Sequence, residues 1–204
     1  MEEKEHGKAG QGIGARVPRK EDSRHLHGRG QYVSDMVMPG QREVAFLRSP
    51  VAHGIIRGIK KPPNSEGRVF VREDLAEAKD IIAPSTLPTY KLSGQPPLAR
   101  GKVRFVGEPV VMCVAKTRAE AEDLAEQVVL DIEELPALVD SEIARFEKDN
   151  RVHDEWDDNL FLTLSVDNGF DALSKQATVV VNREVELSRQ AMVPMEGKAV
   201  VAYW

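Results

Sequence analysis

The sequence predicts an α+β fold with few helices rather than a doubly wound sheet. Short apolar runs typical of strands recur between glycine and proline turns, whereas one segment alone shows strong helical periodicity. Residues 103–133 follow the order strand, turn, strand, helix, strand, so a single helix is expected to cover one face of a strand-rich sheet.

In the first part of the chain, residues 1–14 alternate charge with glycine and predict a flexible tail. Four short strands follow, and we expect the third to pair with the second. They are predicted at 30–35, 43–48, 53–59 and 68–71, with 53–59 as the partner of 43–48. A short helix is expected at 72–79. The proline-rich stretch 81–100 has no clear period and predicts an irregular surface connection.

The strongest local signals lie between residues 103 and 133. A strand at 103–106 precedes a turn at Gly107-Glu-Pro109, and the run Val110–Ala115 is apolar on both faces, which indicates a central buried strand. Thr117 and Glu120 form a capping box at the start of a helix. Its apolar stripe is Ala121, Leu124, Ala125, Val128 and Val129. Period two then begins at 129–133 and predicts another strand.

From Ser141 the composition becomes polar, which indicates a linker. Further strands are predicted at 178–187 and 198–204.

Composition excludes several classes of protein. The 204 residues suit one large domain, or one domain with part of a second. A net charge of −5 argues against a nucleic-acid partner, and no apolar run approaches the roughly 20 residues of a membrane span. The charged start has no secretory apolar stretch, so we expect a cytoplasmic protein. The single Cys113 excludes a disulfide framework and an iron–sulfur cluster ligated by this chain alone.

Candidate chemistry is sparse, and no catalytic, cofactor-binding or metal-ligating residue is assigned. His25 and His27 would lie on one strand face, but no third metal ligand is near them in sequence. His53 follows a Ser-Pro turn and is expected to hydrogen-bond a carbonyl. Cys113 should be a buried, inert thiol with a raised pKa.

The segment around Pro194 allows two interpretations. Met192, Met195 and Glu196 either form a turn between strands or line a cavity.

Several stretches together resemble the molybdenum-binding large subunits of the xanthine dehydrogenase, aldehyde oxidase and carbon monoxide dehydrogenase family. Their order and spacing, more than any one of them, carry the resemblance. They are Gly28-Arg-Gly-Gln-Tyr32 with Asp35, Arg48-Ser-Pro-Val-Ala-His53, Val103-Arg-Phe-Val-Gly-Glu-Pro-Val110, Ala115-Lys-Thr-Arg-Ala-Glu-Ala121, Leu135-Pro136, Gln190, Pro194-Met-Glu196 and Ala202-Tyr-Trp204.

The resemblance implies an α/β hammerhead domain with a mixed sheet at 15–140. Residues 141–204 would form a linker and the first strands of a molybdopterin-binding domain. The hammerhead is scaffold, and the family's glutamate base has no counterpart here. Gln190, Met192 and Glu196 are the residues expected near the substrate channel.

The resemblance also implies partners. Molybdenum with molybdopterin, expected as the cytosine dinucleotide, would lie on a molybdenum-binding chain, and 2Fe–2S clusters and FAD on iron–sulfur and flavin subunits. We therefore expect a structural subunit or N-terminal fragment that is inactive alone. The alternative is a non-catalytic assembly or binding module that keeps the fold without redox chemistry.

Overall fold

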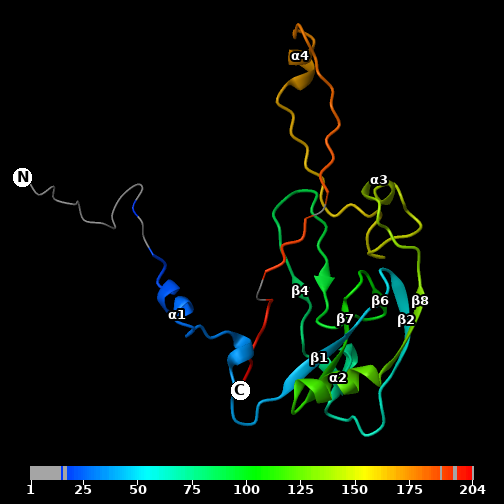
Figure 1. Cartoon of the computed structure of the whole chain (residues 1–204). Coiled ribbons are helices and arrows are strands. Elements are labelled where there is room, and N and C mark those ends of the chain that lie inside the picture. The colour runs from blue at the N-terminus through cyan, green and yellow to red at the C-terminus, as the bar shows by residue number, and fades with distance from the viewer. Residues whose placement is uncertain (1–14, 16–17, 189, 195–196, 204) are drawn as a thin grey trace, which may run out of the picture. The chain divides into compact units, whose positions relative to one another are not determined.

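A computed structural model describes residue 15 and residues 18–188, 190–194 and 197–203 (Figure 1). The chain divides into two compact units, one formed by Met1–Pro39 with Glu184–Trp204 and the other by Gly40–Arg183. All described strands lie in the second unit. Strands and few, short helices together make an α+β fold, as the sequence predicts. No described helix combines the length and apolarity that a bilayer crossing requires.

The first sheet has the strand order β1-β7-β3, with all neighbours antiparallel. It contains β1 (Glu43–Arg48), β7 (Pro109–Ala115) and β3 (Val69–Phe70). The middle strand carries Val110, Val111 and Cys113, whose side chains are completely buried. This confirms the prediction of a central buried strand.

The second sheet has the order β6-β2-β8 and is also antiparallel. It contains β2 (Gly54–Lys60), β6 (Lys102–Val103) and β8 (Val129–Glu134). The predicted pairing of 53–59 with 43–48 is wrong, because the chain between these strands is bound elsewhere. The Ser49 amide donates to the Glu108 carbonyl at 2.8 Å, and the Ser49 carbonyl accepts from the Gly107 amide at 2.8 Å. β2 therefore enters another sheet.

The helix α2 (Arg118–Glu126) contacts β1 and β7 and buries Ala121, Leu124 and Ala125. Its predicted cap is present. Thr117 Oγ1 accepts from the Glu120 amide at 3.2 Å, while the Glu120 carboxylate accepts from the Lys116 amide at 3.1 Å, one residue before the N-cap. Val129, expected in the apolar stripe, is 60% exposed and belongs to β8.

Several shorter predictions need correction. Residues 30–35 form no strand, and Val33–Asp35 form the 3-10 helix η1 instead. The Asp35 carboxylate caps this helix by accepting a hydrogen bond from the Tyr32 amide at 3.0 Å. The helix expected at 72–79 is the 3-10 helix η2 (Arg72–Leu75). Within 81–100 the structure adds the two-residue strands β4 (Ile81–Ile82) and β5 (Gly94–Gln95), which pair with each other.

The strand predicted at 103–106 is reduced to Val103 at the end of β6. The cause is the buried Glu108. Its carboxylate accepts a hydrogen bond from the Arg104 amide at 2.6 Å, so this amide is not available to a neighbouring strand.

Three helices had no sequence prediction: α1 (Asp22–Leu26), α3 (Ser141–Ala144) and α4 (Phe170–Ser174). Asp140 caps α3 by accepting from the amides of Glu142 at 2.8 Å and Ile143 at 3.1 Å.

The strands predicted at 178–187 and 198–204 are not formed by their described residues. A strand needs a neighbour for its amides and carbonyls, and Val181 and Val185 are 73% and 79% exposed. Trp204 and the predicted flexible tail at 1–14 lie outside the described residues. The division into 15–140 and 141–204 stays a prediction.

Candidate functional site

The Gly107-Glu108-Pro109 turn ties the end of β1 to the start of β7. Besides its two backbone bonds with Ser49, the turn accepts a bond of 2.8 Å from Arg48 Nη1 at the Gly107 carbonyl. Gly107 has a φ of +87°, a left-handed conformation that favours glycine. Burial raises the pKa of the Glu108 carboxyl, while the bond from the Arg104 amide and the Arg104 charge oppose this rise.

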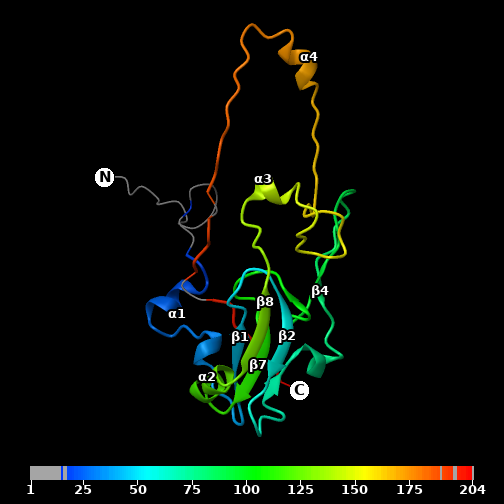
Figure 2. The same cartoon turned by 90° about the vertical axis from the view of Figure 1, so that its right-hand side faces the viewer.

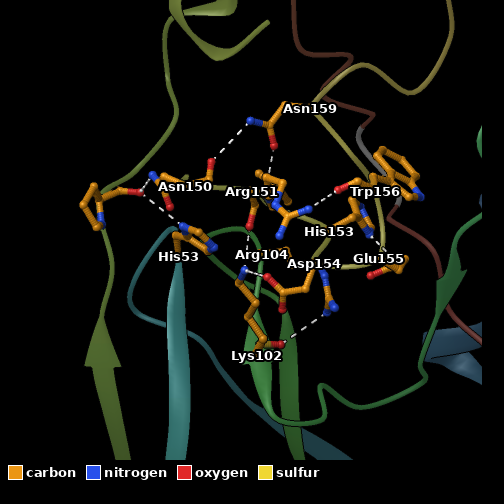
Figure 3. A network of polar contacts seen from close by, with 12 residues as sticks. His53, Lys102, Arg104, Asn150, Arg151, His153, Asp154, Glu155, Trp156 and Asn159 are labelled. Carbon is orange, nitrogen blue, oxygen red and sulfur yellow. Dashed lines mark hydrogen bonds and ion pairs between the residues drawn. The ribbon is translucent and has the colours of Figure 1, made fainter. Parts of the chain in front are cut away.

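A polar network in the same unit holds residues 150–159 against the sheets (Figure 3). We call it the 150–159 network. At its base, the buried Lys102 ammonium donates to the Arg151 carbonyl at 2.6 Å and to the Asp154 carboxylate at 2.8 Å. The Lys102 side chain is only 8% exposed, so this ion pair is shielded from solvent on the lysine side. The bond from Lys102 lowers the pKa of Asp154.

The Asn159 side chain cross-links the backbone of the segment that precedes it. Its side-chain amide donates to the carbonyls of Ala144 at 3.2 Å, Glu147 at 3.1 Å and Asn150 at 3.3 Å. Its Oδ1 accepts from the Val152 amide at 2.9 Å. One side chain thus fixes four backbone positions between 144 and 152.

The Pro136 carbonyl joins β2 to the network. It accepts from His53 Nδ1 at 3.1 Å and from Asn150 Nδ2 at 2.7 Å, as Figure 3 shows for the two labelled side chains. Because a carbonyl can only accept, His53 carries its proton on Nδ1. Its Nε2 is buried and has no partner among the described residues. The expectation that His53 bonds a carbonyl is confirmed.

His153 and Trp156 form the apolar part of the network. Their rings stack with centroids 4.2 Å apart, and the Trp156 carbonyl accepts from Arg151 Nη1 at 2.6 Å. Burial lowers the pKa of His153, and the charges of Arg104 and Lys102 act in the same direction against the opposing Glu155. The neutral form of the His153 ring is therefore favoured over the charged form, and a neutral ring packs well against Trp156.

The described residues bring together no group of three or more His, Cys, Asp or Glu side chains able to hold a metal ion. Cys113 is buried and burial raises its thiol pKa, as expected. His25 and His27 lie at α1 rather than on a strand. His25 stacks on Tyr32 with centroids 5.9 Å apart, and His27 Nδ1 bonds the Ser23 carbonyl at 2.6 Å.

The described residues do not test whether the predicted channel residues form a site. Gln190 is exposed, Met192 is 95% exposed, and Glu196 lies outside the described residues. Their assignment to a substrate channel stays a prediction. The network, by contrast, was missed, because its members are spread over more than a hundred positions and the segment 147–158 shows only polar composition.

An open hollow of about 770 Å³ lies along α2. Its lining contains both basic and acidic side chains, namely Arg42, Arg68, Lys116, Glu120 and Asp123, so its charge favours neither anionic nor cationic ligands.

Known proteins are similar in sequence to between 63% and 93% of this chain. It is 42% identical over 133 residues to the nicotine 6-hydroxylase large subunit of Paenarthrobacter nicotinovorans, covering 63% of this chain and 16% of that one. It is 30% identical over 200 residues to the 6-hydroxypseudooxynicotine dehydrogenase complex subunit gamma of the same organism, covering 93% and 25%. The chain thus spans a quarter or less of these relatives.

A solved structure shows the same fold. The quinoline 2-oxidoreductase of Pseudomonas putida 86 superposes with a TM-score of 0.65 at 39% identity, over 72% of this chain and 19% of that chain.

Residues 27–136 match the family model described as aldehyde oxidase and xanthine dehydrogenase, a/b hammerhead domain. This range contains both three-stranded sheets and α2. The chain therefore belongs to the aldehyde oxidase and xanthine dehydrogenase family, and its residues 27–136 form the hammerhead domain.

Proposed function

We propose that this chain is a scaffold component of a molybdenum hydroxylase, packing against the chain that holds the molybdenum cofactor. The hammerhead match over residues 27–136 carries the proposal. Relatives include the xanthine dehydrogenase molybdenum-binding subunit of Escherichia coli O157:H7. Structures with the same fold include the Cu,Mo-CO dehydrogenase.

The hammerhead would act by position rather than by chemistry. Its strong polar groups are engaged in structural contacts: Glu108 fixes the turn between β1 and β7, and Lys102 fixes the 150–159 network. In this proposal no described residue is assigned to a cofactor. The molybdopterin, as its cytosine dinucleotide, belongs in this proposal to the partner chain, and hydroxylation takes place there.

The remaining redox groups would lie on further subunits. A 2Fe–2S cluster needs four cysteine ligands, or two cysteines and two histidines in the Rieske type, and this chain has one cysteine, so the clusters and FAD are assigned to iron–sulfur and flavin subunits. The proposed complex is cytoplasmic. Residues 141–204 would form the linker and first strands of the molybdopterin-binding domain, with Gln190, Met192 and Glu196 near the substrate approach.

Purification of the complex from its native source tests this proposal. We expect the chain to elute with a larger polypeptide and with molybdenum in fixed proportion, and we expect the isolated chain to contain none. A complex without metal or redox activity would favour the alternative, a non-catalytic assembly module. Substrate turnover by the isolated chain would contradict both.

A further inference from the structure

The strand β8 has a hydrogen-bonding neighbour on one side and none of the described strands on the other. Its neighbour is β2, and the Leu135 amide, just after β8, donates to the His53 carbonyl at 2.9 Å on that side. Successive amides of a strand point in opposite directions, so those of Ile132 and Glu134 point away from β2. Neither amide has a partner among the described residues. Figures 1 and 2 both show β8 at the outside of the unit, next to β2.

We call the side of β8 that faces away from β2 the open edge, and the side chains beside it form two rows. Leu130 and Ile132 are partly buried and pack against the hydrophobic core. The alternate side chains, those of Val129, Asp131 and Glu133, are exposed, and Val129 is 60% exposed. A strand added at the open edge would therefore place one row of its own side chains beside one apolar and two acidic side chains.

The negative charge of the open edge is only partly neutralised. Positions 119–144 contain nine aspartate or glutamate residues and no lysine or arginine. Arg57 on β2 pairs with Glu133, but the two side chains remain 57% and 50% exposed. Asp131 and Glu134 form no ion pair within the described part of the chain. Unpaired backbone groups thus coincide with a local negative potential.

This charge indicates which molecules can pair with the open edge. A second copy of β8 would bring the carboxylates of Asp131 and Glu133 close to the same groups of its partner, and like charges opposite each other destabilise a sheet. Nucleic acids and anionic lipids carry the same sign of charge and are repelled as well. Charged edges of this kind prevent sheets from associating with one another. A strand that carries cations is attracted instead, because opposite charges across a strand pair are stabilising.

We propose that β8 is a docking edge for an extended, basic segment of another polypeptide, which adds a fourth strand to the sheet β6-β2-β8. The backbone of this segment bonds the outward amides of Ile132 and Glu134. Lysine or arginine at two alternate positions lies beside Asp131 and Glu133, and an apolar side chain at the next alternate position covers Val129. The inference does not depend on the proposed function, because it uses only the geometry and charge of one sheet.

Titration of the ¹⁵N-labelled full chain with two capped heptapeptides tests the proposal. The lysine peptide, acetyl-Thr-Lys-Thr-Lys-Thr-Val-Thr-amide, has its cations and valine in the order that antiparallel addition requires, and the glutamate peptide replaces both lysines by glutamate. We expect the lysine peptide to shift the amide signals of Ile132 and Glu134 and to bind about 10-fold more tightly than the glutamate peptide, or better. Raising the salt from about 50 mM to about 500 mM should weaken it by about 3-fold or more.

Substitutions separate backbone pairing from charge. Glu134→Pro removes one outward amide and leaves the amides that face β2, so the lysine peptide should bind about 10-fold more weakly or worse. Glu134→Gln keeps this amide and should cost less than about 3-fold. Asp131→Lys should reduce the preference for the lysine peptide by about 3-fold or more. The matched control Glu66→Lys reverses an exposed charge outside this sheet and should change the affinity less than about twofold.

The possible results are distinct. Equal binding of both peptides, equal binding to Glu134→Pro and Glu134→Gln, or shifts confined to residues outside β8 would each overturn the proposal. Protection of the Ile132 and Glu134 amides that grows with the concentration of the chain alone would identify a second copy as the occupant, and would overturn it too. Unchanged signals from β7 in each variant exclude misfolding as the cause of weaker binding, and Asp131→Lys tests the proposal even where Glu134→Pro does not fold. The molybdenum content of the native complex is measured separately and tests the proposed function alone.

Discussion

Gly54 and Gly58 lie in the same strand, β2, but alanine should have opposite consequences at the two positions. At Gly54, an added Cβ would lie 2.5 Å from Ile132 Cγ2, 2.9 Å from the Glu133 carbonyl oxygen and 3.3 Å from Val51 Cγ2. Gly54 pairs with β6 on one side and β8 on the other, so neither the glycine nor the Glu133 carbonyl can move without disturbing hydrogen-bonded neighbours. At Gly58, nothing lies within 4 Å of the added atom.

The size of the effect follows from these contacts. Overpacking a well-filled interior destabilises by about 1–3 kcal/mol, and contact with a fixed backbone oxygen places Gly54→Ala near the upper end, at about 2–3 kcal/mol. Gly58→Ala should change the free energy of unfolding by less than about 1 kcal/mol and in the stabilising direction, because alanine restricts the unfolded chain. With about 2–4 °C of melting temperature per kcal/mol, Gly54→Ala should melt about 5–10 °C lower.

Urea unfolding followed by far-ultraviolet circular dichroism measures both variants against the unmodified chain. A similar dependence on urea concentration in all three proteins would show that the same surface is exposed on unfolding. If the free energies of unfolding of the two variants agreed within about 0.5 kcal/mol, the close packing of β2 against β8 would be refuted.

Four further outcomes are expected. Gly107→Val should lower the free energy of unfolding by about 2–3 kcal/mol because of the left-handed φ, and Gly107→Asn by clearly less, both measured by urea unfolding. Because burial raises the folded-state pKa of Glu108 above 4.5, the unmodified chain should lose stability relative to Glu108→Gln as the pH rises from 4.5; parallel pH profiles would contradict this. Lys102→Met should increase hydrogen exchange at residues 150–159 but not in β7, since the loop loses two bonds. The lowered pKa of His153 stabilises the fold above pH 6.5, and this contribution to the free energy of unfolding should be lost as the pH falls below it; His153→Phe should remove that part of the pH dependence, measured by urea unfolding.

Local signals made β7 and α2 predictable from the sequence. A run that is apolar on both faces gives a buried strand, and the Thr117–Glu120 spacing marks the start of a helix without reference to the rest of the chain. The partner of β2 was not predictable in this way. It depends on the bonds between Ser49 and the Gly107–Glu108 turn, which join positions far apart in sequence.

The same reason explains why the candidate site was not predicted. A lone lysine at 102 gives no signal, and it becomes a buried anchor only because residues 151–154 fold over it. At 178–187 the sequence predicted a strand that the structure does not contain. These residues have a high strand propensity, but no neighbouring strand is present among the described residues to hydrogen-bond their amides. Propensity is a property of one segment. The burial of Lys102 and the missing strand at 178–187 both depend on which other segments of the chain pack against these residues.

The order of strands in the two sheets has a consequence for synthesis on the ribosome. β1 pairs with β7 and β2 pairs with β6 and β8, so β1 finds its neighbour only when the chain has grown to about residue 115, and β2 completes its pairing only at about residue 134. Until β6 and β7 have been synthesised, the emerging polypeptide carries two unpaired strands that are neighbours in sequence. Long-range pairings of this kind form slowly and leave strand edges open to wrong association. Chaperone protection during translation, and a pause after residue 134 rather than before it, should therefore favour a correctly folded product.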